Sequence, residues 1–214
     1  MKLKKIIFSG SYLLWALGLV VALFLIIYPF IPEIKMRFLK AQNPQIYQSS
    51  YYEQKYDLTN QIQIEKTDTP LIKISVDPTL SDRLIIPVIG VDIELYFNED
   101  QTTALNKGAW VVPGSANPGE KGEMVVTAHR FQALPPAQNT FYHLDKVKVG
   151  DTSLIFTGGF AYKYEVTSTK VLGAEEFKFN GAESTVDDMV LYTCTPLWTA
   201  SHRLIVHSKQ IPFN

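Results

Sequence analysis

Three residue types that together perform acyl transfer are spread along this chain: a cysteine, a histidine and an arginine. Cys194 is the only cysteine, so it cannot close a disulfide within the chain and is buried filler, a surface thiol or a nucleophile. His129 follows the apolar run 124–128, and Arg203 lies nine residues after Cys194. In acyl transfer a thiolate attacks a carbonyl, a second group moves the proton, and a donor stabilises the oxyanion. The three residues therefore predict nucleophilic thiol catalysis.

Short apolar or alternating runs between turn formers predict the strands that would position these residues. We expect strands at 83–86, 91–95, 109–112, 124–128, 152–156, 162–169, 189–193 and 203–209, and one short helix at 140–144. Glycine and proline pairs lie between many of the runs, and no long amphipathic helix pattern lies between them. This arrangement is typical of an all-β barrel or sandwich. Residues 195–202 are enough for a chain reversal, so Cys194, Arg203 and the strand-ending His129 could share one end of the fold.

The N-terminal part of the chain is apolar enough to cross a bilayer. Residues 6–31 form an almost unbroken apolar run of 26 residues, whereas a helical span needs about 20 and a cleaved signal peptide has only about 7–15. We therefore expect a cytoplasmic tail at 1–5, an uncleaved anchor at 6–31, a stalk at 32–80 and a catalytic barrel at 81–214. Basic residues flank the run on both sides, so its orientation is inferred from the expected function of the barrel.

Charge argues against one class of partner. Residues 1–40 carry a net charge of +5 and the remainder −6, and nucleic-acid binding needs a dense basic face. The histidines His143, His202 and His207 fit no metal-ligand spacing, and one cysteine cannot build a structural zinc site. We expect no metal, no cofactor and no nucleic-acid partner. Arg130, beside His129, is expected at the solvated surface.

Around these residues the sequence resembles the sortases, membrane-anchored cysteine transpeptidases of bacterial surfaces. The family's cysteine motif is Thr-Leu-x-Thr-Cys, and here it reads Val-Leu-Tyr-Thr-Cys at 190–194. Thr-Ala-His-Arg at 127–130 is similar to the histidine motif, and His-Arg-Leu-Ile-Val at 202–206 is similar to the arginine strand. The resemblance spans about residues 84–211 in the family's order.

The resemblance implies a closed eight-stranded sortase-like β-barrel with short helices, preceded by a transmembrane helix. It implies that Cys194 attacks the Thr–Gly bond of a Leu-Pro-x-Thr-Gly-like sorting signal on a surface protein and forms a thioester. His129 would transfer the protons, Arg203 would stabilise the oxyanion, and an amine from a cell-wall precursor or a pilin lysine would accept the acyl group. The enzyme would sit in the cell membrane with its N-terminus cytoplasmic and its barrel extracellular.

We also expect substrate contacts at Thr193 and Leu191, and at Trp198, where Leu197-Trp198 replaces the aromatic and glycine of many relatives and would reshape the pocket beside the thiol. The sequence departs from the pilus-polymerising class, because Asp77-Pro78 is followed by Thr79 rather than the aromatic residue of that class's lid. The sortase class therefore stays open. Two other functions stay open as well: a surface cysteine endopeptidase with water as acceptor, and a non-catalytic surface module.

Overall fold

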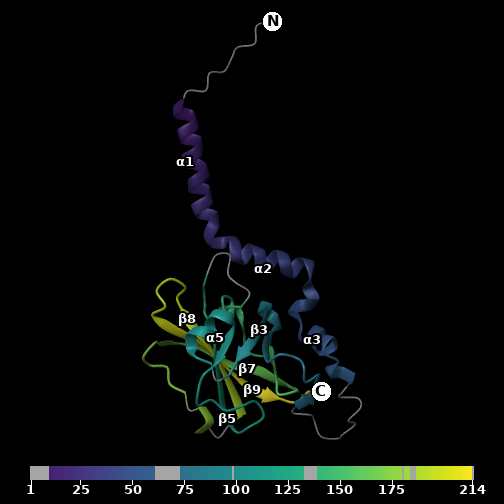
Figure 1. Cartoon of the computed structure of the whole chain (residues 1–214). Coiled ribbons are helices and arrows are strands. Elements are labelled where there is room, and N and C mark those ends of the chain that lie inside the picture. The colour runs from purple at the N-terminus through teal and green to yellow at the C-terminus, as the bar shows by residue number, and fades with distance from the viewer. Residues whose placement is uncertain are drawn as a thin grey trace.

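The barrel is closed by a strand that pairs on both of its edges. The structure is a computed structural model, and it describes residues 10–60, 73–97, 99–132, 139–179, 181–183 and 187–213. The ring follows the order β7-β6-β2-β3-β4-β5-β8-β9, and β9 pairs back onto β7 (Figure 1). The predicted eight-stranded barrel is confirmed. Its strands are β2 (Arg83–Ile86), β3 (Val91–Tyr96), β4 (Ala109–Val111), β5 (Gly122–Thr127), β6 (Thr152–Thr157), β7 (Phe160–Gly173), β8 (Asp187–Thr195) and β9 (His202–Ile211).

Each of these strands falls where the alternating or apolar runs predict one, with ends that differ by a few residues. Two neighbouring pairs, β3–β4 and β5–β8, are parallel and the others are antiparallel. A parallel pair needs a crossover connection, and between β3 and β4 this connection contains the short helix α5 (Gln101–Lys107).

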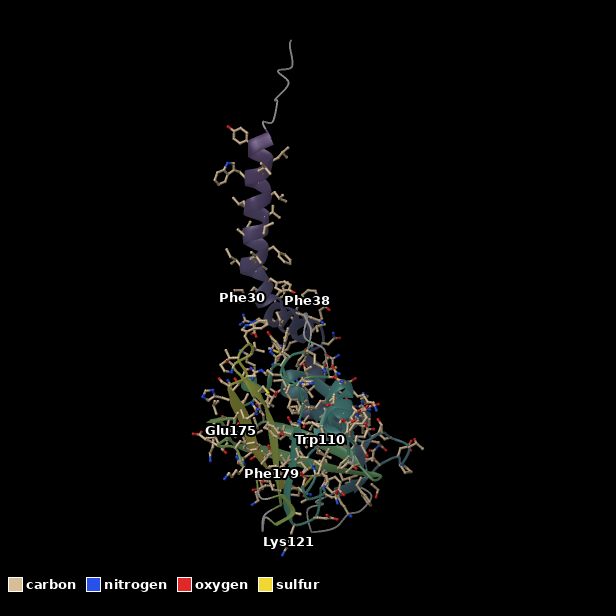
Figure 2. All side chains as sticks on the ribbon, turned by 60° about the vertical axis from the view of Figure 1, so that its left-hand side comes forward. Phe30, Phe38, Trp110, Lys121, Glu175 and Phe179 are labelled. Carbon is tan, nitrogen blue, oxygen red and sulfur yellow. The ribbon has the colours of Figure 1, made fainter. Side chains whose placement is uncertain are left out.

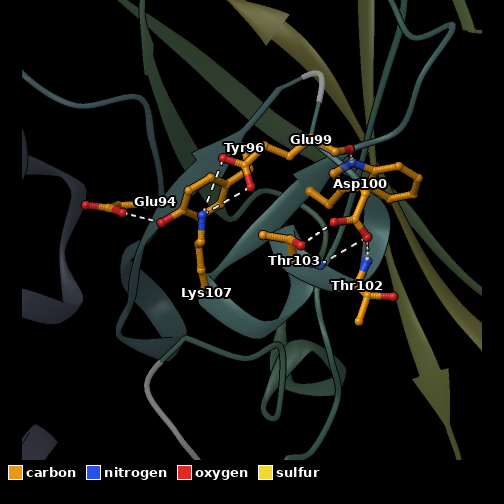
Figure 3. A network of polar contacts seen from close by, with 8 residues as sticks. Glu94, Tyr96, Glu99, Asp100, Thr102, Thr103 and Lys107 are labelled. Carbon is orange, nitrogen blue, oxygen red and sulfur yellow. Dashed lines mark hydrogen bonds and ion pairs between the residues drawn. The ribbon is translucent and has the colours of Figure 1, made fainter.

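The sequence analysis missed α5, because seven residues are too few to show a helical period. The local signal is its N-cap: Asp100 accepts hydrogen bonds from the backbone N–H groups of Thr102 and Thr103, at 2.9 and 3.3 Å (Figure 3). An ion pair of 3.2 Å between Lys107 and Glu99 joins the two ends of this segment. The helix expected at 140–144 is not formed. The chain makes i→i+3 turns there and the 3-10 helix η4 (Leu144–Lys146).

Alternate residues of the strands face inside and outside, and both faces are covered. The interior holds the largest buried cluster, which includes Met124, Leu191 and Val206. A second cluster lies outside the barrel, where Ile85, Leu154 and Phe156 pack against Tyr52 and Leu58. A third, small outer cluster consists of Val125, Val190 and Ile205. It lies on β5, β8 and β9, the three neighbouring strands that carry the candidate site.

The N-terminal segment consists of a projecting helix, α1, followed by a collar (α2 to β1) that packs on the barrel. Its elements are α1 (Gly10–Ile27), η1 (Tyr28–Phe30), α2 (Ile31–Gln42), η2 (Pro44–Tyr47), α3 (Ser49–Lys55) and β1 (Lys73–Ser75). Among the described residues one helical stretch, Tyr12–Gln42, is long and apolar enough by length and composition to cross a membrane. Within it the regular α1 ends at Ile27, and Figure 1 shows α2 running across the direction of α1.

Part of the segment expected to be a stalk, residues 32–80, is packed rather than extended. Tyr52 is 5% exposed and Leu58 is 0% exposed, and Lys163 of β7 pairs with Glu53 at 2.8 Å. β1 adds a ninth strand by pairing with the first residues of β7. The apolar side chains at 52 and 58 bind this segment to the barrel, which polar composition alone does not reveal.

Candidate active site

Cys194 and Arg203 are direct partners across two antiparallel strands. Cys194 is the penultimate residue of β8, Arg203 is the second residue of β9, and the register pairs them. The Cα atoms of such partners lie about 4.5–5.5 Å apart. The connecting loop, 196–201, is closed by a 3.0 Å hydrogen bond from the Ala200 N–H to the Pro196 carbonyl. The predicted meeting of these two side chains therefore follows from one hairpin.

The backbone of β5 leads to His129 on the other side of Cys194. The parallel register of β5 and β8 pairs Thr127 with Tyr192, and two side-chain hydrogen bonds continue the alignment. The Thr127 hydroxyl donates to the Tyr192 carbonyl at 3.0 Å, and the buried Thr193 hydroxyl donates to the Ala128 carbonyl at 2.8 Å. His129 follows Ala128 along the chain, and Cys194 follows Thr193. The strand order therefore sets the histidine, the cysteine and the arginine side by side, with the cysteine in the middle.

Cys194 and Arg203 lie on the outer face of the barrel, and the alternation of β5, if continued two residues past its end at Thr127, brings His129 to the same face. Because side chains alternate along a strand, residues two or four apart lie on one face. Val125, Val190 and Ile205 form the outer cluster, Cys194 and Arg203 have the same parity on β8 and β9, and His129 follows Val125 by four residues, just beyond the end of β5. Each of the three is partly exposed, so a peptide from solvent can reach them. The site is thus a strip on the barrel surface at the ends of β5 and β8.

The Arg203 guanidinium is held by the loop beside it. Its Nη1 donates to the carbonyl oxygens of Ala200 and His202, at 3.0 and 3.1 Å. Both hydrogen bonds that it makes among the described residues use Nη1. A guanidinium has five N–H donors, so Nε and Nη2 remain for a ligand such as a carbonyl oxygen.

Tyr192 belongs to the site and was missed by the sequence analysis. It lies two residues before Cys194 on the same face and packs against Phe177 with ring centroids 4.8 Å apart. Burial raises the pKa of the Tyr192 phenol, with smaller effects from the Thr127 hydroxyl, Arg203 and Cys194. The phenol therefore lies within electrostatic reach of both the thiol and the guanidinium. The strand parity of 192 and 194 is the signal that could have identified it.

Trp198, one of the predicted substrate contacts, is 71% exposed in the loop after β8. Its ring packs edge-on against Phe131, with centroids 5.2 Å apart, and Phe131 lies 6.3 Å from the Tyr142 ring. Phe131 follows His129 by two residues. The three rings form an apolar rim beside the histidine, which suits an apolar side chain of a bound peptide.

The other two predicted substrate contacts are placed differently. Leu191 is 1% exposed and belongs to the interior cluster, so its side chain faces the core rather than a ligand. Thr193 is also 1% exposed, and its hydroxyl is engaged by the Ala128 carbonyl. In this structure Thr193 aligns the two strands that carry His129 and Cys194 and does not present a group to a substrate.

Arg130 is buried, not solvated as expected. It is 7% exposed and pairs with Asp145 at 2.9 Å, while its Nε and Nη1 have no hydrogen-bond partner among the described residues. Burial lowers the pKa of the guanidinium and Asp145 raises it, with burial the larger effect. The ion pair links the residue after His129 to the segment before β6.

The Asp77-Pro78 turn lies far from the thiol. Val76 donates its N–H to the Gly159 carbonyl at 2.9 Å, and Gly159 immediately precedes β7. The opposite end of β7, at Leu172, is the register partner of Arg203. The described residues 73–80 therefore lie at the other end of this strand and do not cover Cys194.

Comparison with known proteins finds relatives over the barrel part of the chain. The sortase domain family model matches residues 84–211, a range that includes all three candidate residues. Sortase D of Bacillus subtilis (strain 168) is 24% identical over 151 residues, which are 68% of this chain and 72% of that protein.

Solved structures are similar as well. The type III crystal structure of Streptococcus agalactiae sortase C1 is 36% identical with a TM-score of 0.55, covering 62% of this chain and 68% of that chain. Sortase A from Corynebacterium diphtheriae is 28% identical with a TM-score of 0.56, covering 78% and 71%. Since the family model covers more than half of the chain and includes the strand ends that bring His129, Cys194 and Arg203 together, the chain belongs to the sortase family.

Proposed function

We propose that this protein is a cysteine transpeptidase that cleaves a Leu-Pro-x-Thr-Gly-like sorting signal and transfers the acyl fragment to an amine at the cell surface. The observation that carries the proposal is the side-by-side order of His129, Cys194 and Arg203 on one outer face. Neighbouring strands lie about 4.7–4.9 Å apart. One proton-transfer group and one cation thus flank the thiol, which is the set of parts that thiol acyl transfer needs.

In the first half of the reaction the Cys194 thiolate attacks the threonine carbonyl carbon of the signal. The negative charge that develops on the carbonyl oxygen is stabilised by the free N–H groups of Arg203. His129 donates a proton to the departing glycine nitrogen, the C–N bond breaks, and a thioester to Cys194 remains.

In the second half an amine attacks the thioester carbonyl. His129 accepts the proton that the amine loses, the C–S bond breaks, and Cys194 leaves as thiolate. The outer strip places the thioester on the barrel surface, where a bulky acceptor such as a cell-wall precursor or a pilin lysine has access. Arg130 and Thr193 serve as supports, since each ties the β5 end to another element.

The proposed location is the cell membrane, with the barrel outside. Sortases are membrane-associated surface enzymes, and this chain has one N-terminal apolar helix. α1 has 18 residues, about 27 Å at 1.5 Å per residue, which is close to the bilayer core thickness of about 30 Å. We propose that α1 crosses the membrane once, with the N-terminus cytoplasmic.

The test is covalent capture. The full-length protein in detergent is incubated with a panel of sorting-signal peptides, and mass spectrometry follows an acyl adduct on Cys194. We expect an adduct with at least one peptide, and none with the Cys194→Ala variant. Failure across the panel with a folded protein would contradict the proposal.

The acceptor is tested on the same adduct. Adding oligoglycine or hydroxylamine should divert the acyl group to the added amine and raise the rate at which the adduct disappears. If water releases the acyl group at an unchanged rate in the presence of either amine, the protein is an endopeptidase instead. If Cys194→Ala leaves surface display of substrate proteins unchanged in cells, a non-catalytic role is favoured.

A further inference from the structure

We propose that α2 makes a second contact with the membrane, lying in the headgroup region on an outward apolar face made by Ile34 and Phe38 together with Phe30, the last residue of η1 and the N-cap of α2. The partner is an anionic lipid surface. This inference rests on the proposed membrane anchoring by α1, and its test separates failure of the anchor from failure of the α2 contact.

The outward face is apolar and open. Phe30 is 61% exposed, Ile34 55% and Phe38 61%. They are spaced four residues apart, which places neighbours on one side of a helix. Figure 2 shows Phe30 and Phe38 between α1 and the barrel. A contiguous apolar patch of this kind on a folded protein marks an interaction site.

The barrel cannot be the partner of this face, because α2 already contacts the barrel with its opposite side. Pro32 is buried, and Met36 and Leu39 line a cavity of about 200 Å³ whose far wall includes Ile89 and Val91. An ion pair of 3.9 Å between Glu33 and Lys146 adds to this contact. Successive residues are about 100° apart around a helix axis, so the average direction of positions 32, 36 and 39 is almost opposite to that of Ile34.

Continuity with α1 identifies a bilayer as the occupant. The length of α1 is close to the thickness of the hydrocarbon core, so α2 begins near the point where the chain leaves it. The bend between them coincides with the 3-10 turn η1, which contains Pro29, and α2 then runs across the direction of α1 (Figure 1). α2 cannot continue the span, because it carries Glu33 and three basic residues whose burial in hydrocarbon is expensive.

Charge specifies the kind of lipid. On the helical wheel Lys35 lies on one side of the Phe30–Ile34–Phe38 face, and Arg37 and Lys40 lie on the other. Basic side chains that border an apolar face extend to the headgroups while their stems stay in the apolar layer. α2 itself carries Glu33 against Lys35, Arg37 and Lys40, a net charge of +2, and residues 41–214 carry −6, so an anionic surface attracts this helix and repels the barrel.

The contact would turn the candidate active site toward the membrane. Lys121, which precedes β5, lies at the end of the barrel far from α1 (Figure 2). β5 and the parallel β8 therefore run toward α2 and end there. With α2 held in the headgroups, Cys194 faces the bilayer side, so the peptides it meets are those held close to the membrane surface.

The experiment measures depth in the bilayer by spin labelling of the full-length protein. Cys194→Ala serves as the background, and single cysteines replace Leu17 in α1, Ile34 or Phe38 in α2, and Val149 on the barrel. Val149 is 67% exposed and serves as the solvent control. Each labelled protein is reconstituted as one copy per nanodisc, with equal parts of phosphatidylcholine and phosphatidylglycerol, and collisions with oxygen and with a water-soluble nickel complex are compared.

We expect oxygen to dominate at positions 17, 34 and 38, with the deepest signal at 17, and the nickel complex to dominate at 149. Replacing Lys35, Arg37 and Lys40 together by glutamine should move labels 34 and 38 toward water and leave label 17 unchanged. A water-like signal at 34 and 38 with an immersed label at 17 would overturn the α2 contact alone. A water-like signal at 17 as well would overturn the anchor.

A second copy of the chain is the competing occupant. It would appear as dipolar broadening between labels at position 38 in vesicles that hold several copies, together with a water-like signal in single-copy nanodiscs. That result would assign the face to a dimer and overturn the lipid contact. Phe38→Ser, a change at an exposed position, gives a further check, since it should reduce immersion at 34 without lowering the melting temperature.

Discussion

At the scale of single residues, the site depends on one hydroxyl that does no chemistry. Thr193 joins β8 to the end of β5 through its 2.8 Å hydrogen bond to the Ala128 carbonyl. His129 lies beyond the last paired residue of β5, so this bond and the hydrogen bond from the Phe141 N–H to the His129 carbonyl, at 2.8 Å, fix its backbone. The position of His129 relative to Cys194 therefore depends on a buried side chain whose hydroxyl is engaged by the protein itself.

We predict that Thr193→Val destabilises the protein and slows acylation. Thr193→Ser keeps the hydroxyl, so both effects should be smaller in that variant. Valine keeps the shape but leaves the buried Ala128 carbonyl without its donor, which costs about 1–3 kcal/mol of unfolding free energy. Urea unfolding and the rate of adduct formation on Cys194 measure the two effects. Equal behaviour of the valine and serine variants would show that the hydroxyl is not what aligns the strands.

At the scale of elements, the collar is part of the folded barrel. Leu58 is 0% exposed and packs with Ile85, Leu154 and Phe156 on the outer face of β2 and β6. The same strands carry the interior core on their other side. Removing the collar would thus expose apolar surface on a sheet that needs both faces covered.

We predict that Leu58→Ala lowers the unfolding free energy of the whole protein by about 2–5 kcal/mol, the range for a buried leucine. Val149→Ala, at a site 67% exposed, should change it little. Urea unfolding followed by tryptophan fluorescence, with the protein in detergent micelles, gives both values. An unchanged transition in Leu58→Ala would mean that the collar unfolds separately from the barrel.

The elements also show which features the sequence could predict. Strong alternation located the eight barrel strands, and the family motifs identified Cys194, His129 and Arg203. The packed collar was not predicted, because its buried positions, such as Tyr52 and Leu58, are spaced among polar residues. The core position of Leu191 and the inward Thr193 hydroxyl follow from strand parity, which becomes certain only when the register is known.

At the scale of the whole molecule, His143 connects the collar to the active-site end. It lines the cavity under α2, and its ring lies 4.9 Å from that of Tyr142 in the aromatic rim. Burial lowers the pKa of His143 below its ordinary value of 6.5. Its other influences are Glu33 and Asp145, which raise the pKa, and Lys146 and Arg130, which lower it.

We predict an acid sensitivity that His143→Gln reduces. Since the pKa is lowered in the folded protein, the unfolded chain binds the proton at a higher pH. Stability is therefore lost as the pH falls from about 6.5 through the lowered pKa. Urea unfolding at neutral and mildly acidic pH should show a smaller loss in His143→Gln than in the wild type. His207→Gln controls for the removal of a histidine elsewhere, and an equal loss in all three proteins would contradict the prediction.

The strand order has a consequence for when the enzyme becomes reactive. Cys194 and Arg203 come from one hairpin, but the histidine comes from a strand 65 residues earlier and joins them only through the parallel β5–β8 pairing. Contacts between such distant parts of a chain form late, because they require a large loop to close. Under the proposed topology and catalytic roles, a newly made chain that is still crossing the membrane would expose a thiol without its proton carrier, and premature coupling to neighbouring proteins would be avoided until the barrel has closed.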